Sequence, residues 1–203
     1  MQGDATPIDG VGAGSISQAG SDEPRFPEAL LTGGDRRSIA RSDRARRLVR
    51  ANPARVSELV TLTKDHDWLV AMRAVDLLEK LAHEHVEWVE PYKRVFIGDL
   101  ADSDTWEVHL QIVRTLPLFT WKRSERRRVV DILVRDVEHR RMFVKAWALD
   151  SLATFAAQDT TLMPLVRRWL ARFEQSGSAA LATRARHIRR RLSSQLPEAK
   201  AGP

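Results

Sequence analysis

The stretch Trp68-Leu-Val-Ala-Met-Arg-Ala-Val-Asp-Leu-Leu-Glu-Lys-Leu-Ala82 carries its large apolar side chains on one broad face of a helix. They recur at intervals of three and four residues, which is the period of an α-helix with one buried side. Before the stretch stand three possible N-caps, Thr63, Asp65 and Asp67, whose side-chain oxygens can accept hydrogen bonds from free backbone N–H groups. On the polar side, Asp76 and Lys80 are spaced to form an ion pair. The stretch therefore predicts an amphipathic helix.

Apolar pairs return along the chain at a nearly constant interval, with steps of 37, 36 and 37 residues. These pairs are Leu59-Val60, Phe96-Ile97, Ile132-Leu133 and Trp169-Leu170. A companion series lies between them, at steps of 38 and 36 residues. It consists of Trp68, Trp106 and Met142. Such a period is typical of stacked helical units that bury apolar surface only against their neighbours. We therefore expect the tryptophans of both series to lie in the core.

The apolar patterns predict an all-α fold, a short right-handed α-solenoid of about four helical hairpins with a C-terminal capping helix. The hairpins are predicted at residues 39–62, 67–100, 104–133 and 142–173, and the capping helix at 179–192. Four residues mark the expected helix boundaries. Pro91 suits the first turn of a second helix, and Pro117 should end or kink the helix that contains it. Asp104 and Asp159 are the expected caps of the helices that follow them.

The two ends of the chain differ from this repeat domain, which we place at residues 35–195. Residues 1–34 are rich in Gly, Ser and Asp, with five acids against one arginine, and are predicted to be a disordered acidic tail. Within them, a short anchor could dock on the body through Phe26, Pro27, Leu30 and Leu31. Residues 196–203 are predicted to be a frayed tail.

The composition excludes several classes of site. The chain has 203 residues and no cysteine, which rules out disulfides, thiolate metal sites and cysteine nucleophiles. It contains neither a long apolar run nor a secretory signal, so we expect a cytoplasmic protein without a membrane span. The net charge is +6, and because the first 34 residues carry −4 the remainder carries +10. A basic body can attract nucleic acid or an acidic protein, although an arginine-rich, GC-rich bacterial coding sequence would give the same balance.

The repeats resemble those of the HEAT-repeat superfamily, and the resemblance covers roughly residues 36–194. It rests on the hairpin length, on a turn Asp before the first helix of a hairpin (Asp65 or Asp67, then Asp104), and on two segments beginning at Trp68 and Phe143. Asp67, Val70 and Arg73 match the family's pattern of a turn Asp followed by a Val-x-x-Arg run. The resemblance implies a solenoid whose second helices line the concave face. It does not identify a function, because this superfamily includes scaffolds, adaptors and a few enzymes.

The sequence carries no enzyme signature, and we expect no cofactor and no metal. HEAT-like iron hydroxylases use several His-Glu pairs on successive repeats, whereas only His83-Glu84 is found here. Certain bacterial alkylpurine DNA glycosylases are also built from HEAT-like repeats, with Trp and Asp residues near the damaged nucleotide. By that resemblance, Trp147 and Asp150 could form an aromatic–acid pair, since Trp147 belongs to neither apolar series. The alternative is that Trp147 packs between repeats and that Asp150 is solvated.

Clusters of arginine provide the second candidate site. Several of them fall on the second helices of the third and fourth hairpins, where they could form a basic stripe on the concave face. The candidates are Arg126, Arg127, Arg135, Arg168 and Arg172, with Arg189 on the capping helix. Such a stripe suits a phosphate backbone or an acidic peptide. A solvated, internally paired surface is the alternative, because Asp131, Asp136 and Glu138 interrupt the clusters.

These features favour a non-catalytic scaffold or adaptor that binds a protein with an acidic or mixed surface through its basic concave face. The alternative is a nucleic-acid-binding HEAT-like protein, which could be related to the bacterial alkylpurine DNA glycosylases.

Overall fold

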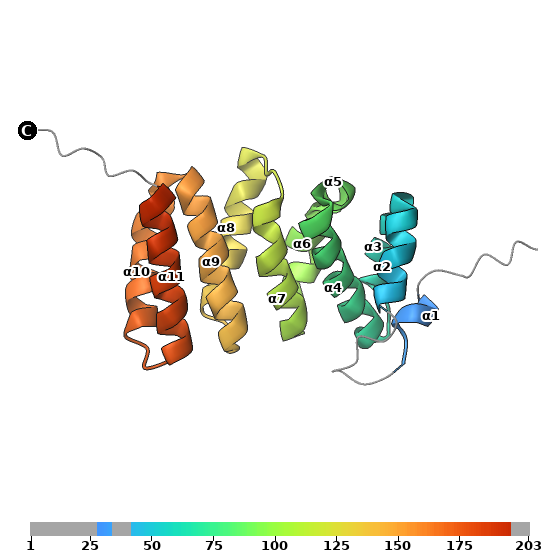
Figure 1. Ribbon diagram of the computed structural model, residues 1–203, viewed down its shortest axis with the longest axis horizontal. Helices are drawn as coiled ribbons and strands as arrows, with labels where there is room; N and C mark the ends of the chain where they lie inside the picture. The colour runs from blue at the N-terminus through green and yellow to red at the C-terminus, as the bar shows by residue number, and fades with distance from the viewer. Residues whose placement is uncertain (1–27, 34–41, 196–203) are drawn as a thin grey trace, which may run out of the picture.

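The computed structural model describes residues 28–33 and 42–195, and the regular structure in these ranges is entirely helical. Five helices stand side by side and form what we call the first layer (Figure 1). They are α2 (Ser42–Ala51), α4 (Trp68–Glu84), α7 (Trp106–Thr115), α9 (Met142–Gln158) and α11 (Ala179–Gln195). The second layer lies behind them. It consists of α3 (Val56–Leu62), α6 (Arg94–Ile97), α8 (Arg123–Val137) and α10 (Met163–Glu174). A short helix, α1 (Glu28–Leu31), packs against α2 and α4.

The core runs between the layers, and the first apolar series supplies much of it. Helices α3, α8 and α10 each pack against the first-layer helix that follows them in the chain. Leu59, Phe96, Ile132, Leu133 and Leu170 are almost completely buried. Burial of one such side chain contributes about 1.5–3 kcal/mol, so these positions hold each layer to the other. Their prediction as inward-facing residues is confirmed.

The companion series does not behave in the same way. Trp68 is 48% exposed and Met142 is 42% exposed, so their prediction as core residues is wrong. Both residues begin a first-layer helix, and the first turn projects beyond the part of the helix that its neighbours cover. Trp106 is half-buried at the equivalent position, with the Arg141 guanidinium 5.4 Å from its ring centroid. The period is the same in both series, but only the pairs on the second-layer helices mark the core.

The second helix of the second hairpin is broken into short pieces. The chain forms α5 (Val86–Val89), a 3-10 turn at Glu90–Tyr92, α6 and a further 3-10 turn at Asp99–Asp102. Pro91 lies in the first turn of the 3-10 segment, where its missing N–H leaves no intrahelical bond unmade, so its predicted place is confirmed. At Gly98 the backbone turns away from helical geometry, with ψ at −127°. The prediction of one helix from Pro91 to Leu100 is therefore wrong.

Other boundaries follow the predicted signals. Asp67 accepts a hydrogen bond from the Leu69 N–H at 2.9 Å at the start of α4. Pro117 ends α7, whose last turn tightens into a 3-10 turn. Asp159 accepts from the Thr161 N–H at 3.1 Å. The role predicted for Asp104 is wrong. Thr105 occupies the capping position of α7, and its side chain makes no capping hydrogen bond.

The N-terminal anchor lies partly inside the described residues. Leu31 is completely buried, and Arg73 of α4 donates hydrogen bonds to the carbonyl oxygens of Leu31 and Gly33 at 2.5 and 2.8 Å. Arg73 is itself only 2% exposed, so its guanidinium satisfies the carbonyls at the end of α1 from within the core. The rest of the acidic segment, at 1–27 and 34, and the C-terminal segment at 196–203 lie outside the described residues, and their disorder stays a prediction.

The different burial of Trp169 and Trp68 predicts different losses in the free energy of unfolding when each is replaced by alanine. Trp169 of α10 is buried against Phe173, so Trp169→Ala should lower the free energy of unfolding by about 3–5 kcal/mol. Trp68→Ala removes a half-exposed ring and should cost clearly less. Urea unfolding of both variants, followed by circular dichroism, measures the difference. A loss below about 1 kcal/mol for Trp169→Ala would contradict its place in the core.

Candidate functional site

Polar side chains connect α4, α7, α9 and α11 across the outer face of the first layer. Each connection joins a residue on one helix to a residue on the next, so that the contacts form a diagonal series. We call this set the polar ladder. It consists of Asp76, Glu79, Gln111, Arg114, Trp147, Asp150, Arg184 and Arg191. Residues three and four apart lie on one stripe of a helix, which brings these side chains to the same face.

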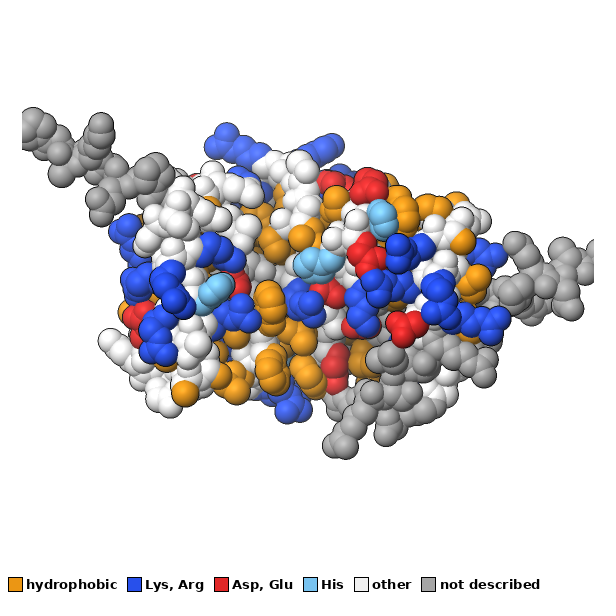
Figure 2. Space-filling model, viewed as in Figure 1, with side chains coloured by type: hydrophobic (Ala, Val, Ile, Leu, Met, Phe, Trp, Pro, Cys, Tyr) orange, Lys and Arg blue, Asp and Glu red, His pale blue; other side chains and the backbone are white. Residues whose placement is uncertain are grey.

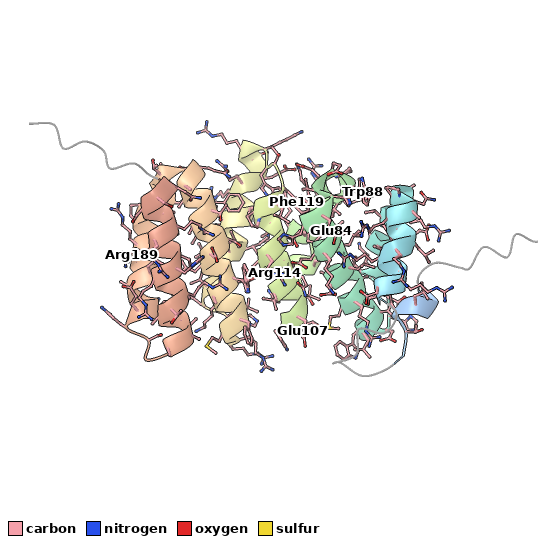
Figure 3. All side chains as sticks on the ribbon, in the orientation of Figure 1. Glu84, Trp88, Glu107, Arg114, Phe119 and Arg189 are labelled. Atoms are coloured by element: carbon pink, nitrogen blue, oxygen red, sulfur yellow. The ribbon has the colours of Figure 1, made fainter. Side chains whose placement is uncertain are left out.

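The first part of the ladder joins α4 to α7. Asp76 accepts a hydrogen bond from Gln111 at 3.0 Å and one from Lys80 at 2.6 Å. Glu79, which is only 2% exposed, pairs with Arg114 at 2.8 Å and with His83 at 3.0 Å. Burial raises the pKa of Glu79, and the charges of Arg114 and His83 offset part of that rise. Arg114 stands near the middle of the row of helices (Figure 3).

The second part joins α7, α9 and α11 around Trp147. The guanidinium carbon of Arg114 lies 5.2 Å from the Trp147 ring centroid, and that of Arg184 lies 4.4 Å from it. Both distances are within the range of cation–π attraction. Asp150 pairs with Arg184 at 2.8 Å and with Arg191 at 2.5 Å, one through each carboxylate oxygen. Arg191 also donates to the backbone carbonyl of Asp150 at 3.0 Å, which fixes α11 against α9.

This geometry decides between the two interpretations of Trp147 and Asp150 only in part. Trp147 is half-buried and packs between helices, but Asp150 is buried at 5% exposure, so its description as solvated is wrong. The physical reason is that α11 supplies two guanidinium groups that replace the water around the carboxylate. Because each oxygen of Asp150 has an arginine partner, this carboxylate is not open to a positively charged base. The aromatic–acid pair for DNA binding stays a prediction.

The charges of the ladder are arranged by depth. Glu79 and Asp150 lie underneath with nearly inaccessible side chains, whereas the third acid, Asp76, has a side chain that is 25% exposed. Lysine and arginine side chains form a band across this face (Figure 2). At Arg114 and Arg184 an approaching ligand therefore meets the cation before the carboxylate that holds it.

Two features extend the ladder to the ends of the row. At the N-terminal end, Arg46 of α2 pairs with Glu84 of α4. At the C-terminal end, a shallow hollow of about 600 Å³ lies along α11 and presents Arg184, His187 and Arg190. Its lining contains no acid, and its other members are small side chains. The C-terminal hollow therefore has a positive charge without an adjacent carboxylate on its surface.

The arginines of the predicted basic stripe lie elsewhere. Arg126, Arg127, Arg135, Arg168 and Arg172 are on α8 and α10 in the second layer, and Arg189 is on α11. Three of them pair with acids: Arg135 with Asp136 at 3.1 Å, Arg172 with Glu138 at 3.6 Å and Arg189 with Glu174 at 3.0 Å.

Arg126 donates to Gln158 at 2.7 Å, while Arg127 and Arg168 are exposed. The stripe stays a prediction, and internal pairing accounts for half of its members.

A separate buried cluster joins α7 to α8. His109 lies with Nδ1 3.1 Å from an oxygen of Asp136 and with Nε2 2.6 Å from the Ser103 carbonyl oxygen. Both ring nitrogens face acceptors, an arrangement that favours the doubly protonated ring. The hydrogen bond to Asp136 raises the pKa of His109 above its ordinary value. The neighbouring His139 ring, 5.3 Å away, has its pKa lowered by burial and by the charge of His109.

Comparison with other proteins adds no assignment. No model of a protein family matches the sequence, and no curated protein matches it. In the part of the chain that the structure describes, no three His, Asp or Glu side chains are grouped so as to hold a metal ion, including those around His83-Glu84. No helix within residues 28–33 and 42–195 is long and apolar enough to cross a membrane.

The ladder predicts that Asp150 is a structural link. Asp150→Ala leaves Arg184 and Arg191 without their carboxylate, and we expect the free energy of unfolding to fall by about 2–4 kcal/mol, somewhat below the cost of a fully buried pair because the arginines are partly solvated. Urea unfolding measures this loss. Asp131→Ala is the matched control, since Asp131 is exposed on α8, and it should change stability by less than about 0.5 kcal/mol. Equal effects of the two variants would show that Asp150 is not a link.

The His109 cluster predicts a pH dependence of stability. Because its pKa is raised in the folded state, the stability that His109 contributes is fully present below its unfolded pKa of about 6.5. That contribution is lost as pH rises through the folded pKa. His109→Gln should therefore lose more stability at pH 5.5 than at pH 9.

Both proteins should carry His139→Gln, so that the opposite shift of His139 does not enter. The readout is urea unfolding at the two pH values. A cost that is the same at both would contradict the charged His109–Asp136 pair.

Proposed function

We propose that the protein is a non-catalytic interaction module of the HEAT-repeat type that binds a partner protein along its first layer. In this proposal the helices form a short right-handed solenoid of about four hairpins, which α11 closes. The alternation of the chain between the two layers and the position of α11 at the end of the row support it (Figure 1). The resemblance of the segment after Asp67 to the HEAT pattern supports it as well.

The packing favours the first layer as the concave side. Neighbouring first-layer helices α4, α7, α9 and α11 pack closely against one another, whereas the second-layer helices α6, α8 and α10 touch each other at few points. A row of hairpins that is closer on one side bends toward that side, because the other side is splayed. In this proposal the first layer is the concave face, whereas the superfamily resemblance predicts the concave face on the second helices. The arginines of α8 and α10 would then lie on the opposite face.

The observation that carries the proposal is the polar ladder. A surface that only solvates the protein needs no contacts that cross four helices, whereas the ladder fixes arginine and tryptophan side chains in one geometry. Arginine and tryptophan are enriched among the residues that dominate binding energy at protein interfaces. Side chains held in place before binding lose less entropy when a partner arrives.

Nucleic acid is the second candidate partner. The band of lysine and arginine on the first layer favours it (Figure 2). The carboxylates of Asp76, Glu79, Glu84 and Asp150 weigh against it, because they neutralise cations that would otherwise face phosphates.

Site-directed photo-crosslinking tests the proposal. A benzoylphenylalanine at Thr183, exposed on α11, should capture one defined protein from an extract of the producing cells, and the same group at Arg127 on α8 should not. The purified partner should bind the unmodified protein, and Trp147→Ala should weaken that binding about tenfold or more. Capture only from Arg127 would contradict the choice of face.

Binding of a 20-base-pair duplex across a salt series tests the second candidate. Tight binding with a steep loss of affinity as salt rises would favour nucleic acid, whereas no binding at low salt excludes it.

A further inference from the structure

We propose that the protein forms a weak two-fold dimer through the edge of the row at which α7 and α9 begin. The partner at this edge is a second copy of the chain, so the inference goes beyond the proposed function, and the outer face of the first layer stays open. Glu107 marks the edge at the lower end of α7 (Figure 3). We call it the helix-start edge. It consists of Asp104, Trp106, Arg140, Arg141, Met142 and Phe143.

Apolar side chains reach the surface at the helix-start edge (Figure 2). In the part of the chain that the structure describes, three large apolar side chains are exposed, and two of them are the adjacent residues Met142 and Phe143. Phe143 is the more exposed of these, at 63%. The Arg141 guanidinium, 5.4 Å from the Trp106 ring centroid, brings the half-buried Trp106 to the start of α9. A contact that covers these side chains removes apolar surface from water, which favours association.

Opposite charges occupy equivalent positions at the starts of the two helices. Asp104 stands two residues before the first residue of α7, and Arg140 stands two residues before the first residue of α9. Both are exposed, and neither forms an ion pair within residues 28–33 and 42–195. Helices α7 and α9 pack together, and packed helices lie about 8–10 Å apart, axis to axis. An acid and a base without ion-pair partners therefore stand about one helix spacing apart along the edge.

A two-fold axis between the starts of α7 and α9 exchanges these two positions. It places Asp104 of one copy against Arg140 of the partner subunit, and the reverse contact follows by symmetry. The same operation places Trp106 of each copy against Met142 of the partner subunit. Both the charges and the apolar side chains are therefore complementary when the occupant is a second copy in this orientation.

The neighbouring acids are compatible with this pairing. The same axis brings Asp102 towards Glu138 of the partner subunit, but each of these acids has an arginine of its own chain beside it. Asp102 pairs with Arg128 at 3.3 Å, and Glu138 pairs with Arg172 at 3.6 Å. An anionic membrane or a nucleic acid fits the edge less well, because Asp102, Asp104 and Glu138 are exposed acids that would face its phosphates.

The small size of the edge makes the dimer weak. Three large apolar side chains and two ion-pairing groups from each copy are fewer than the roughly 20–30 residues a side of a stable interface. We expect a dissociation constant of about 10–100 µM, which belongs to transient association. The dimer presents two first-layer faces at once, so a partner with two binding segments would bind it more tightly than it binds one copy.

Sedimentation equilibrium of the full chain tests the dimer, from about 5 to about 500 µM. We expect reversible self-association over this range. Phe143→Ser removes the most exposed apolar side chain of the edge and should weaken the dimer about tenfold or more. Because Phe143 is exposed, this variant should keep its fold, which circular dichroism and the urea midpoint check.

Charge reversal tests the orientation. Asp104→Arg and Arg140→Glu each replace two attractions by two repulsions and should weaken the dimer about fivefold or more. The double variant exchanges the two charges and should recover the original affinity within about threefold. An equimolar mixture of the two single variants should form dimers for the same reason. Asp131→Arg and Arg127→Glu make the same charge changes at exposed positions on α8 and should leave the affinity unchanged.

Four outcomes would overturn the inference. These are a monomer at the highest concentration, an unchanged affinity in Phe143→Ser, a double variant as weak as the single variants, and equal losses in the controls on α8. The last outcome would show that net charge, and not the position of the charges, governs association. A monomer would leave the proposed interaction module standing, because the first layer takes no part in this contact.

Discussion

The enclosed position of α9 is the constraint on which the rest of the first layer depends. This helix packs against α7, α8, α10 and α11, so most of its side chains are buried or half-buried. The helix is itself apolar nearly all round, and its two buried polar side chains, Asp150 and Ser151, must find partners inside the protein. Ser151 donates to the Val113 carbonyl of α7, and Asp150 takes Arg184 and Arg191 of α11. Each polar side chain of α9 thus specifies one of its two neighbours in the row.

The pairing of Asp150 also determines how the arginines at the surface are oriented. A buried carboxylate without a cation would be costly, so the arginines of α11 are held above Asp150 whether or not a ligand is present. Because Arg184 also lies against Trp147, and Trp147 lies near Arg114, the link continues to Glu79 of α4. The interactions that fix the order of the helices are therefore the same ones that orient the exposed cations. A substitution at Asp150 should therefore alter both the stability of the fold and the orientation of these arginines.

Much of the helical architecture could be predicted from the sequence, because burial of Ile132, Leu133 and Leu170 follows from a period that any stacked helix would show. The exposure of Trp68 could not, since periodicity places a residue on a face but does not say how far along the helix the neighbours reach. The ladder was missed for another reason. Gln111, Trp147 and Arg184 recur at 36 and 37 residues, which is the apolar period, but their chemical types differ and no single motif unites them. Their partners, such as Asp150, become evident only when adjacent helices are in contact.

The net charge of the chain does not show which of its charged side chains are exposed and which are buried in pairs. An excess of arginine in the sequence does not distinguish a free cationic stripe from a set of internal pairs. Three of the six predicted arginines pair with acids: Arg135 on α8, Arg172 on α10 and Arg189 on α11. In the first layer the pairs are stacked in depth, with Glu79 and Asp150 below the cations that they hold. A carboxylate in that position lowers the net charge of the surface but keeps its outermost groups cationic and rigid. The depth of each pair, and not the net charge of the chain, therefore determines which charges the first layer presents at its surface.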